Sequence, residues 1–541
     1  MQRCRHNLVP ALSIVGLFFS LIGVCLSPIS GTLIYGSLLG YYQGINPIFW
    51  FGYAVIILAI IVSFHDKDAS FGSLLPFFAF FWVFFFTPTL RENLPRHLDA
   101  WYMLGMSKEI ANQGHIPLFN SVTEKWTIYY KWPGFFTFSS MMKLITGIDF
   151  FTTSESLSIV LSFFFPLTWY VAIKKLTSNA IELKLSLLVF LLTFMFIGSP
   201  QFSPQYFALV LYPLVIVLWL ENGSRSTRVI AILLTFLVTV IHPISSTILL
   251  CMLLAIVVAQ RLIRRDLGGS QRKENGYLLL LAVIFFFFWN FYYSSAYSFE
   301  TLISQTKNYL ATLLLQNELK PLTQLLMGSP PNVSLWYERF TRYFPIFLAV
   351  VGLFLLLRTK RNRSRGLLLG SLLIGTFLAF PIIFVTSGQW WDRFFEFAAL
   401  PVAVLASAAL FKVYHSKHRA IFFAIILSLT LLVSFKFIIT YNEPVFIHTQ
   451  QELTLGVFTV SHVGNSSSLL TDYKTNTVLY FLDPVYKLYS KVSREELQAK
   501  SYDLLLMNGL STQHVNSTLI GELDNRLYDS GSCEIYSRHL K

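Results

Sequence analysis

The stretch "FGSLLPFFAFFWVFFFTPTLRENLPRHLDAWY", residues 71–102, changes from apolar to charged in its middle, and this change indicates the fold class. Residues 71–88 contain no charged side chain. An apolar run of about 20 residues is long enough to cross a bilayer as a helix, and a slightly shorter run suffices where the membrane is thin. The charged residues that follow include Asp99. The stretch therefore predicts a transmembrane helix that leads into a polar segment at the membrane surface.

The composition of the whole chain extends this interpretation. Of its 541 residues, 54% are hydrophobic and only 13% are charged, which excludes a soluble protein. Because lipid offers no hydrogen-bond partners to exposed backbone, the spans are expected to be helices. We predict an all-α polytopic membrane protein with about thirteen transmembrane helices. The predicted spans are 8–27, 47–64, 71–88, 155–173, 184–199, 204–220, 228–241, 244–260, 277–294, 343–357, 366–386, 397–411 and 420–440.

The distribution of Lys and Arg predicts the orientation in the cell (plasma) membrane. If the N-terminus is cytoplasmic, the segments placed inside hold 21 of the 41 Lys and Arg residues but six of the 28 Asp and Glu residues. The inside segments therefore carry an excess of positive charge, which follows the positive-inside rule. With thirteen spans, this orientation places the C-terminus outside the cytoplasm. The net charge of +13 is then explained by the basic residues that set the membrane topology. We therefore expect no nucleic-acid partner. The first span lacks a clear cleavage site and is expected to remain as an anchor.

Besides an outer loop at 295–342, two long extracytoplasmic segments are predicted. The first is an outer loop, 89–154, within a transmembrane domain that covers 1–440. Its apolar part is "GFFTFSSMMKLITGI" at 134–148. If this part were a span, every later loop would move to the opposite side of the membrane and break the positive-inside rule. We therefore expect it at the outer interface, flat or re-entrant. The second is 441–541, where short strand-like runs alternate with helical stretches, which predicts a small α/β domain. The four cysteines show neither a disulfide framework nor metal-ligand spacing.

Asp99 is the first candidate for chemistry in the outer loop. It precedes a predicted helix, Ala100 to Gln113, that Gly114 and Pro117 would end. One interpretation is that Asp99 caps this helix, because Asp is a favoured N-cap residue. The other is a general base or metal ligand, placed where a substrate arrives from the lipid. The two roles are compatible, since a cap would also hold the carboxylate in place.

Lys131 is the second candidate. It lies in "TIYYKWPGFF", residues 127–136, where Tyr129, Tyr130 and Trp132 surround it. Such a cluster is common in aromatic belts with a lysine that reaches the interface. Alternatively, a lysine held at headgroup depth beside an apolar helix binds the phosphate of a lipid carrier.

The order of these features resembles a known family. "LDAWY" at 98–102, the helix "MSKEIANQGHIP", the turn "YYKWPG" at 129–134 and the apolar helix after it are similar to the first outer loop of GT-C glycosyltransferases. The closest likeness is to the protein O-mannosyltransferase and lipid A aminoarabinose transferase group. Trp132 departs from the family turn, which has proline at this place. The segment "DRFFEFAALPVAVLA", 392–406, resembles a late family segment in which an arginine precedes a proline-containing span.

The resemblance implies a function and a set of residues. It implies an inverting hexosyl- or pentosyltransferase that takes a sugar from a dolichyl- or undecaprenyl-phosphate donor and transfers it to a lipid, glycan or protein acceptor on the outer face. Asp99 would be catalytic. The implied substrate-binding residues are Lys131, Arg393, Arg96 and Tyr102.

The cofactor stays open. Asp99 is the carboxylate that a divalent metal would bind if the enzyme uses one. Some relatives carry a second carboxylate in the next outer loop, but the corresponding "GSPQFSPQ", 198–205, has none. Glu92, Glu124 and Asp392 are the carboxylates that could replace it.

Two alternatives compete with this prediction. "QWWDRF", 389–394, resembles the tryptophan–aspartate motif of oligosaccharyltransferases, but that motif lies in a soluble domain and this one between two spans. The other alternative is a transporter or flippase of lipid-linked sugars, with His242 and Asn290 along its path. No inverted repeat supports it, and a large outer loop with an outer domain suits an enzyme better.

Overall fold

The computed structural model places most of the chain. The residues it describes are 2–27, 42, 44–66, 68–91, 94–95, 98–117, 127–193, 202–221, 224–267, 276–294, 333–387, 391–414, 419–440, 450–462, 469–471, 478–479, 481–482, 488–489, 504–508, 525–529 and 533–537.

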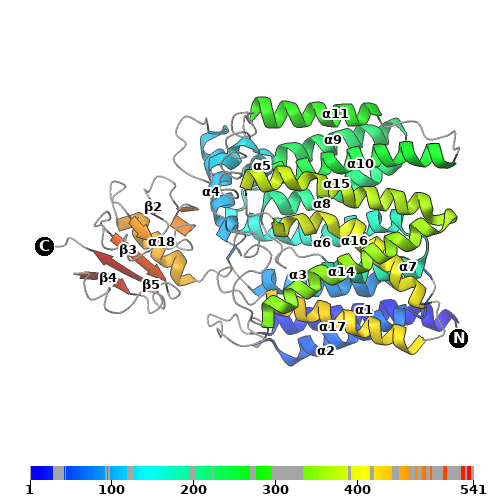
Figure 1. Ribbon diagram of the computed structural model, residues 1–541. Helices are drawn as coiled ribbons and strands as arrows, with labels where there is room; N and C mark the ends of the chain where they lie inside the picture. Colours follow the sequence, from blue (N-terminus) through cyan, green and yellow to red (C-terminus); the bar gives the residue numbers. More distant parts are fainter. Residues whose placement is uncertain are drawn as a thin grey trace, which may run out of the picture.

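Long helices run side by side and form a bundle, with the N-terminus at the end opposite to the C-terminal sheet (Figure 1). A helix lies at each of the thirteen positions predicted as spans. They are α1 (Gln2–Cys25), α2 (Pro47–Ser63), α3 (Phe71–Arg91), α6 (Phe150–Leu176), α7 (Ala180–Thr193), α8 (Pro204–Leu220), α9 (Arg225–Ile241), α10 (Pro243–Leu267), α11 (Gly276–Phe287) with the π-helix η3 (Phe288–Tyr293), α14 (Val333–Arg358), α15 (Arg363–Ser387), α16 (Trp391–Tyr414) and α17 (Arg419–Thr440).

The described helices make the chain a multi-pass membrane protein. Six of them are long and apolar enough to cross a membrane, or seven if the bent pair Tyr343–Arg358 and Lys360–Ala379 counts as one span. Several of the others are shorter apolar helices, such as Pro47–Ser63 and Pro204–Leu220. The number of thirteen crossings therefore stays a prediction.

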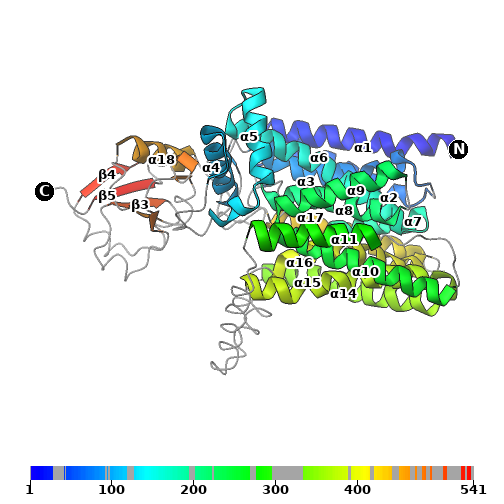
Figure 2. The same ribbon diagram turned by 90° about the horizontal axis from the view of Figure 1, so that it is seen from above.

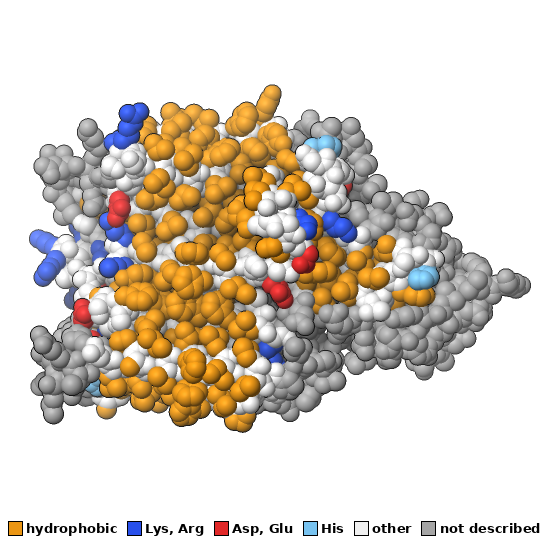
Figure 3. All heavy atoms as spheres, turned by 180° about the vertical axis from the view of Figure 1, so that it is seen from behind, with side chains coloured by type: hydrophobic (Ala, Val, Ile, Leu, Met, Phe, Trp, Pro, Cys, Tyr) orange, Lys and Arg blue, Asp and Glu red, His pale blue; other side chains and the backbone are white. Residues whose placement is uncertain are grey.

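The surface of the bundle explains why these helices need lipid. Hydrophobic side chains cover most of the described face in Figure 3, and Lys and Arg side chains gather at the end remote from the C-terminal domain. Exposed apolar residues such as Phe18, Leu233 and Phe354 are 58%, 59% and 63% accessible. A continuous apolar surface of this kind marks contact with a membrane.

Helices α1 and α2 approach each other backbone to backbone. A Cβ atom at Gly16 would lie 2.6 Å from Cγ1 of Ile56 and 2.8 Å from the carbonyl oxygen of Gly52. Gly23 faces Phe49 in the same way. Small residues at such crossings let membrane helices pack closely, since lipid supplies no hydrophobic drive between helices.

Two helices lie across one end of the bundle (Figure 2). They are α4 (Leu98–Gln113) and α5 (Gly134–Thr146), and the 3-10 helix η2 (Thr127–Lys131) precedes α5. Gly114 has φ +71° directly after α4, as predicted for a helix that ends at Gln113. Helix α5 exposes Leu144 and Ile145, which are 64% and 76% accessible, in agreement with a helix at the interface.

The described strands of the C-terminal part form one mixed sheet. They are β1 (Leu469–Thr471), β2 (Leu488–Tyr489), β3 (Leu504–Asn508), β4 (Asn525–Asp529) and β5 (Cys533–Ser537), in the order β2-β1-β3-β5-β4. Strand β1 is parallel to β2 and β3, whereas β5 is antiparallel to β3 and β4. Helix α18 (Gln450–His462) precedes the sheet.

The C-terminal part contacts α4 through Phe481. Its ring lies 5.6 Å from that of Trp101 and 4.9 Å from that of Phe151. Nζ of Lys108 lies 5.1 Å from the centre of the same ring and donates to the carbonyl oxygens of Phe481 and Leu482, at 3.3 and 3.1 Å.

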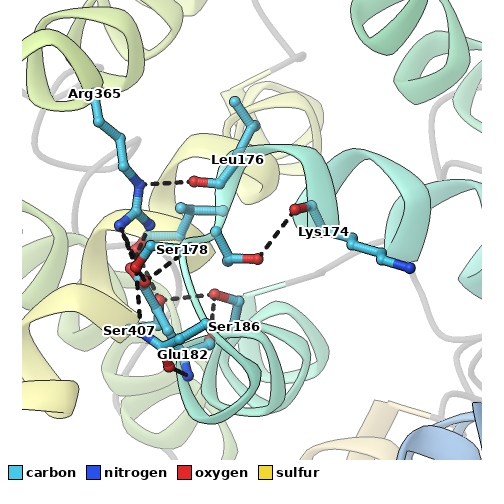
Figure 4. A network of polar contacts seen from close by, with 10 residues as sticks. Lys174, Leu176, Ser178, Glu182, Ser186, Arg365 and Ser407 are labelled. Carbon is cyan, nitrogen blue, oxygen red and sulfur yellow. Dashed lines mark hydrogen bonds and ion pairs between the residues drawn. The ribbon is translucent and has the colours of Figure 1, made fainter. Parts of the chain in front are cut away.

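A buried ion pair joins α7 to α15 at the opposite end of the bundle (Figure 4). Arg365 contacts both carboxylate oxygens of Glu182, whose side chain is 2% accessible. Nε of Arg365 also donates to the carbonyl oxygen of Leu176 at 2.7 Å, and the Ser178 hydroxyl donates to Glu182 at 2.7 Å. Glu182 is thus hydrogen-bonded by both neighbours, as a buried carboxylate requires.

Candidate active site

Asp99 lies in the first turn of α4 and does not cap it. The helix begins at Leu98, one residue earlier, so the interpretation of Asp99 as the N-cap is wrong. Its side chain is half-buried. The start of α4 is held by Trp101, whose Nε1 donates to the carbonyl oxygen of Pro95 at 3.0 Å. The carboxylate therefore projects from a fixed helical turn.

The other predicted substrate-binding residues are placed unequally. Tyr102, three residues after Asp99 in α4, is buried and 3% accessible. The backbone of Arg393 belongs to the first turn of α16, but its side chain lies outside the described residues. Arg96 lies outside them as well.

Lys131 ends the short helix η2 and is half-buried. Burial lowers the pKa of its ammonium group below the ordinary value for lysine, because desolvation disfavours the charged form. An anion in contact with the ammonium would oppose that shift. This position is therefore suited to a phosphate group that arrives at the membrane surface.

The π-helix η3 holds the turn that carries Lys131. Nε1 of Trp289 donates to the carbonyl oxygen of Lys131 at 3.1 Å, and Nε1 of the buried Trp132 donates to Oδ1 of Asn290 at 3.0 Å. Asn290 is oriented in turn by its own Nδ2, which donates to Phe286. Trp132, the residue that departs from the family turn, thus makes a hydrogen bond that proline cannot make.

Side-chain bonds join this turn to the helix of Asp99. The hydroxyl of Tyr130 donates to one carboxylate oxygen of Glu109, and Nε2 of Gln113 donates to the other at 3.0 Å. The Ser140 hydroxyl of α5 donates to the carbonyl oxygen of Ser107 at 2.6 Å. The structure therefore bonds the turn of Lys131 and helix α5 to the part of α4 around Ser107 and Glu109, eight to ten residues after Asp99.

Sequence reasoning missed the buried carboxylate of Glu396. It lies in α16, which begins at Trp391, so Glu396 belongs to a helix that starts before the predicted span 397–411. Oε2 of Glu396 accepts a hydrogen bond from Nε2 of Gln205 at 2.8 Å, and both residues are 2% accessible. The signal was present in "FFEF", a single acid among aromatics at the start of a span. The earlier candidates Glu92 and Glu124, and the side chain of Asp392, lie outside the described residues.

Arg91 is a second residue that the sequence analysis missed. It ends α3 on the side of the bundle where the outer loop begins, and only 4% of it is accessible. A Cβ atom at Gly44 would lie 3.9 Å from its Nη2. A buried guanidinium next to the loop of Asp99 adds positive charge to this end of the bundle.

His242 has a structural role. Its Nδ1 accepts the backbone N–H of Ser245 at 3.2 Å and lies 2.8 Å from the hydroxyl of the same residue. This is the geometry of an N-cap for α10, which begins at Pro243. Because Nδ1 accepts from the backbone, the proton of the neutral ring resides on Nε2.

A metal ion in a protein is usually held by several His, Cys, Asp or Glu side chains. Among the described residues, no three or more of these side chains are close enough together to hold an ion. Asp99 and Glu396 lie in different helices, α4 and α16. The described part of the chain thus does not by itself supply a ligand set.

Comparisons with known proteins find similar solved structures but no sequence relative. No protein-family model matches the chain, and no curated protein matches it significantly. The fold is similar to that of ArnT from Cupriavidus metallidurans bound to undecaprenyl phosphate, with a TM-score of 0.47 and 12% identity over 87% of this chain and 99% of that one. It is also similar to the Archaeoglobus fulgidus oligosaccharyltransferase tethered with an acceptor peptide, with a TM-score of 0.45 and 11% identity over 90% and 74%.

Both neighbours are GT-C enzymes, the superfamily that the sequence resembles. At this score and identity the likeness carries no argument about residues, donor or acceptor. The case for a function therefore rests on the chain's own residues.

Proposed function

We propose that the chain is a membrane glycosyltransferase that moves a sugar from a polyprenyl-phosphate donor to an acceptor on the outer face of the membrane. The observation that carries this proposal is the cross-linked pair of elements at the outer end of the bundle. Helix α4 presents Asp99, and the turn bonded to it through Tyr130 and Glu109 presents the half-buried Lys131.

The surroundings of Lys131 favour a lipid-borne donor over a soluble one. Helix α5 follows the lysine directly and exposes Met141, Leu144 and Ile145. An amphipathic helix of this kind lies in the headgroup region, where the phosphate of a lipid carrier is found. A polyprenyl chain in the leaflet would thus bring its phosphate to the depth of the ammonium group.

The proposed reaction follows from these two groups. The oxygen of an acceptor hydroxyl attacks the anomeric carbon of the sugar, and the bond from that carbon to the phosphate oxygen breaks. The electron pair of that bond stays on the polyprenyl phosphate, where Lys131 stabilises the negative charge. The hydroxyl proton passes to the carboxylate of Asp99. Attack from the face opposite to the leaving group inverts the configuration of the sugar.

The proposal also includes the membrane topology, the further donor contacts and the acceptor. In the proposed topology of thirteen spans, the N-terminus is cytoplasmic and residues 441–541 lie outside, on the side of the site. Arg393 and Arg96 are proposed as further contacts of the donor, and Tyr102 as a residue that supports the substrate. The acceptor is a lipid, glycan or protein of the cell surface.

The test is a transfer assay with the purified full chain in lipid nanodiscs. Radiolabelled undecaprenyl- and dolichyl-phosphate sugars, with hexoses and pentoses in parallel, are incubated with membrane extracts as the source of acceptor. We expect label to move from the lipid to a product, with release of polyprenyl phosphate. Movement of intact labelled lipid between leaflets without any product would instead identify a transporter of lipid-linked sugars.

A further inference from the structure

Gln205 and Glu396 form a buried amide–carboxylate pair between the starts of α8 and α16. Nε2 of Gln205 donates to Oε2 of Glu396 at 2.8 Å. The NH2 group of the amide therefore faces the carboxyl group of Glu396. Its carbonyl oxygen Oε1 is thereby directed away from the carboxylate.

That oxygen is a buried acceptor to which no donor from the described part of the chain is bonded. Buried polar atoms in native proteins nearly always have a partner, which here must come from outside these residues. A neutral amide oxygen suits a hydroxyl, because a cation would be drawn to the carboxylate of Glu396 instead.

The pair lies next to the elements of the proposed donor site. The ring of Phe202 lies 4.7 Å from that of Phe135 in α5, and the ring of Phe207 lies 5.5 Å from that of Phe138. Gln205 stands between these two contacts in the chain. Because Phe135 follows Lys131 by four residues, the start of α8, which carries Gln205, packs against the helix that begins just after the lysine.

The depth of the pair fits the sugar part of such a donor. Glu396 is five residues inside α16, which corresponds to about 7 Å along the helix. A ligand whose phosphate is at the bundle end, near Lys131, has its sugar next to the phosphate. Since the start of α8 packs on α5, the amide lies at the same end of the bundle as Lys131, where a sugar attached to this phosphate would be.

We propose that Oε1 of Gln205 accepts a hydrogen bond from a hydroxyl group of the sugar carried by the lipid donor. Glu396 is the positioning residue that fixes the orientation of the amide. The inference rests on the proposed function, which it deepens by assigning a contact for the sugar as distinct from the phosphate. Neither residue takes part in a covalent step.

The experiment compares the binding of bare undecaprenyl phosphate with that of undecaprenyl-phosphate glucose, mannose and arabinose. Binding is measured on the full chain in nanodiscs. We expect Gln205→Met to weaken the binding of at least one sugar-bearing lipid about threefold to tenfold, the usual effect of one neutral hydrogen bond. Binding of the bare lipid should not change. Gln450→Met, at the start of α18, is the matched control and should change neither.

Variants of Glu396 test its positioning role. Glu396→Met should give the same selective loss, because the amide is then free to turn. Glu396→Gln keeps an acceptor for the NH2 group of Gln205 and should restore sugar binding. A purely structural role would instead alter the binding of both kinds of lipid.

The outcomes separate the two proposals. If Gln205→Met weakens the binding of bare and sugar-bearing lipids equally, or changes the binding of neither, the proposed sugar contact is wrong. The phosphate contact of the wild-type protein is unaffected by that result. If the wild-type protein binds none of these lipids, the proposed function fails and this inference fails with it.

Discussion

The indole N–H of Trp132 donates to Oδ1 of Asn290 across 3.0 Å, although 158 residues separate the two in the chain. Next to this bond, Trp289 holds the carbonyl oxygen of Lys131. Two indole hydrogen bonds therefore attach the turn that contains Lys131 to the π-helix η3. One is donated by Trp132 of the turn and the other by Trp289 of η3. Single π-helical turns inside a span occur frequently at functional sites, and here the turn positions adjacent residues, Trp289 and Asn290, against the same loop.

The first prediction concerns this bond. Asn290→Leu leaves the buried indole of Trp132 without its acceptor, which costs about 1–3 kcal/mol. We expect a loss of thermal stability and weaker binding of undecaprenyl phosphate, because the turn is no longer held. Asn290→Asp retains an acceptor and should keep much of the binding. Equal binding in the wild type and the leucine variant would show that the bond does not position Lys131.

The second prediction concerns the charge of Lys131. Lys131→Ala should weaken undecaprenyl-phosphate binding about tenfold to a hundredfold, the effect of one charge-assisted contact of about 1.5–3 kcal/mol, while Lys131→Arg keeps part of it. The control is Lys143→Ala, because Lys143 donates to the carbonyl oxygen of Gly147 at the end of its own helix. Unchanged binding in Lys131→Ala would leave only the role in an aromatic belt.

A pH profile follows from the same lysine. Burial lowers its pKa, so it loses its proton at a lower pH than a fully solvated lysine does. Binding of the lipid phosphate should be complete below that pKa and fall as the pH rises through it. The arginine variant should show no such fall, because arginine stays charged throughout this range. If binding by the wild type and by Lys131→Arg falls with pH in the same way, Lys131 does not bind the lipid phosphate.

The third prediction separates catalysis from structure at Asp99. As a base, an amide is a poor substitute for a carboxylate, so Asp99→Asn should reduce sugar transfer at least a hundredfold with stability near that of the wild type. Asp149 supplies the matched control, because it is a true N-cap whose Oδ1 accepts from the backbone of Phe151 and Thr152 at 2.9 and 3.1 Å. Asp149→Asn keeps this cap and should transfer sugar normally. Full turnover by Asp99→Asn would remove the carboxylate from the mechanism.

The fourth prediction concerns the ion pair between Glu182 and Arg365. Glu182→Ala leaves a partly buried guanidinium without its carboxylate, which is expected to cost about 3–5 kcal/mol in the free energy of unfolding. The exposed pair Lys175–Glu221, whose side chains are 40% and 44% accessible, is the comparison. Glu221→Ala should cost at most about 1 kcal/mol. Thermal unfolding in detergent measures both, and similar shifts would show that burial adds nothing to the first pair.

The fifth prediction is topological. Reporter fusions after Lys175, Arg265 and Arg365 should be cytoplasmic, whereas fusions after Trp132 and at the C-terminus should be outside. The reason is that the segments placed inside contain 21 of the 41 basic residues but only six of the 28 acidic ones. A cytoplasmic C-terminus would exclude the thirteen-span topology.

Local properties of the sequence were enough to determine the helices. Apolar runs predict spans because backbone in lipid must bond within its own helix, and a helix lies at each predicted position. The end of α4 at Gly114 was also predictable, since a left-handed residue commonly ends a helix and glycine adopts this conformation at low cost. The choice of Asp99 and Lys131 came from their order in the chain, which the family resemblance supplied.

Only the tertiary structure decided which side chains meet. Gln205 and Glu396 are 191 residues apart, and neither segment indicates that the other is its partner, yet helix packing brings them together away from solvent. Trp132 and Asn290 meet for the same reason. The position of Asp99 within α4 also escaped the sequence pattern, because Asp is favoured both at the N-cap and in the first turn. Hydrophobicity and helix signals act over a few neighbouring residues, whereas hydrogen bonds between helices depend on how distant segments pack.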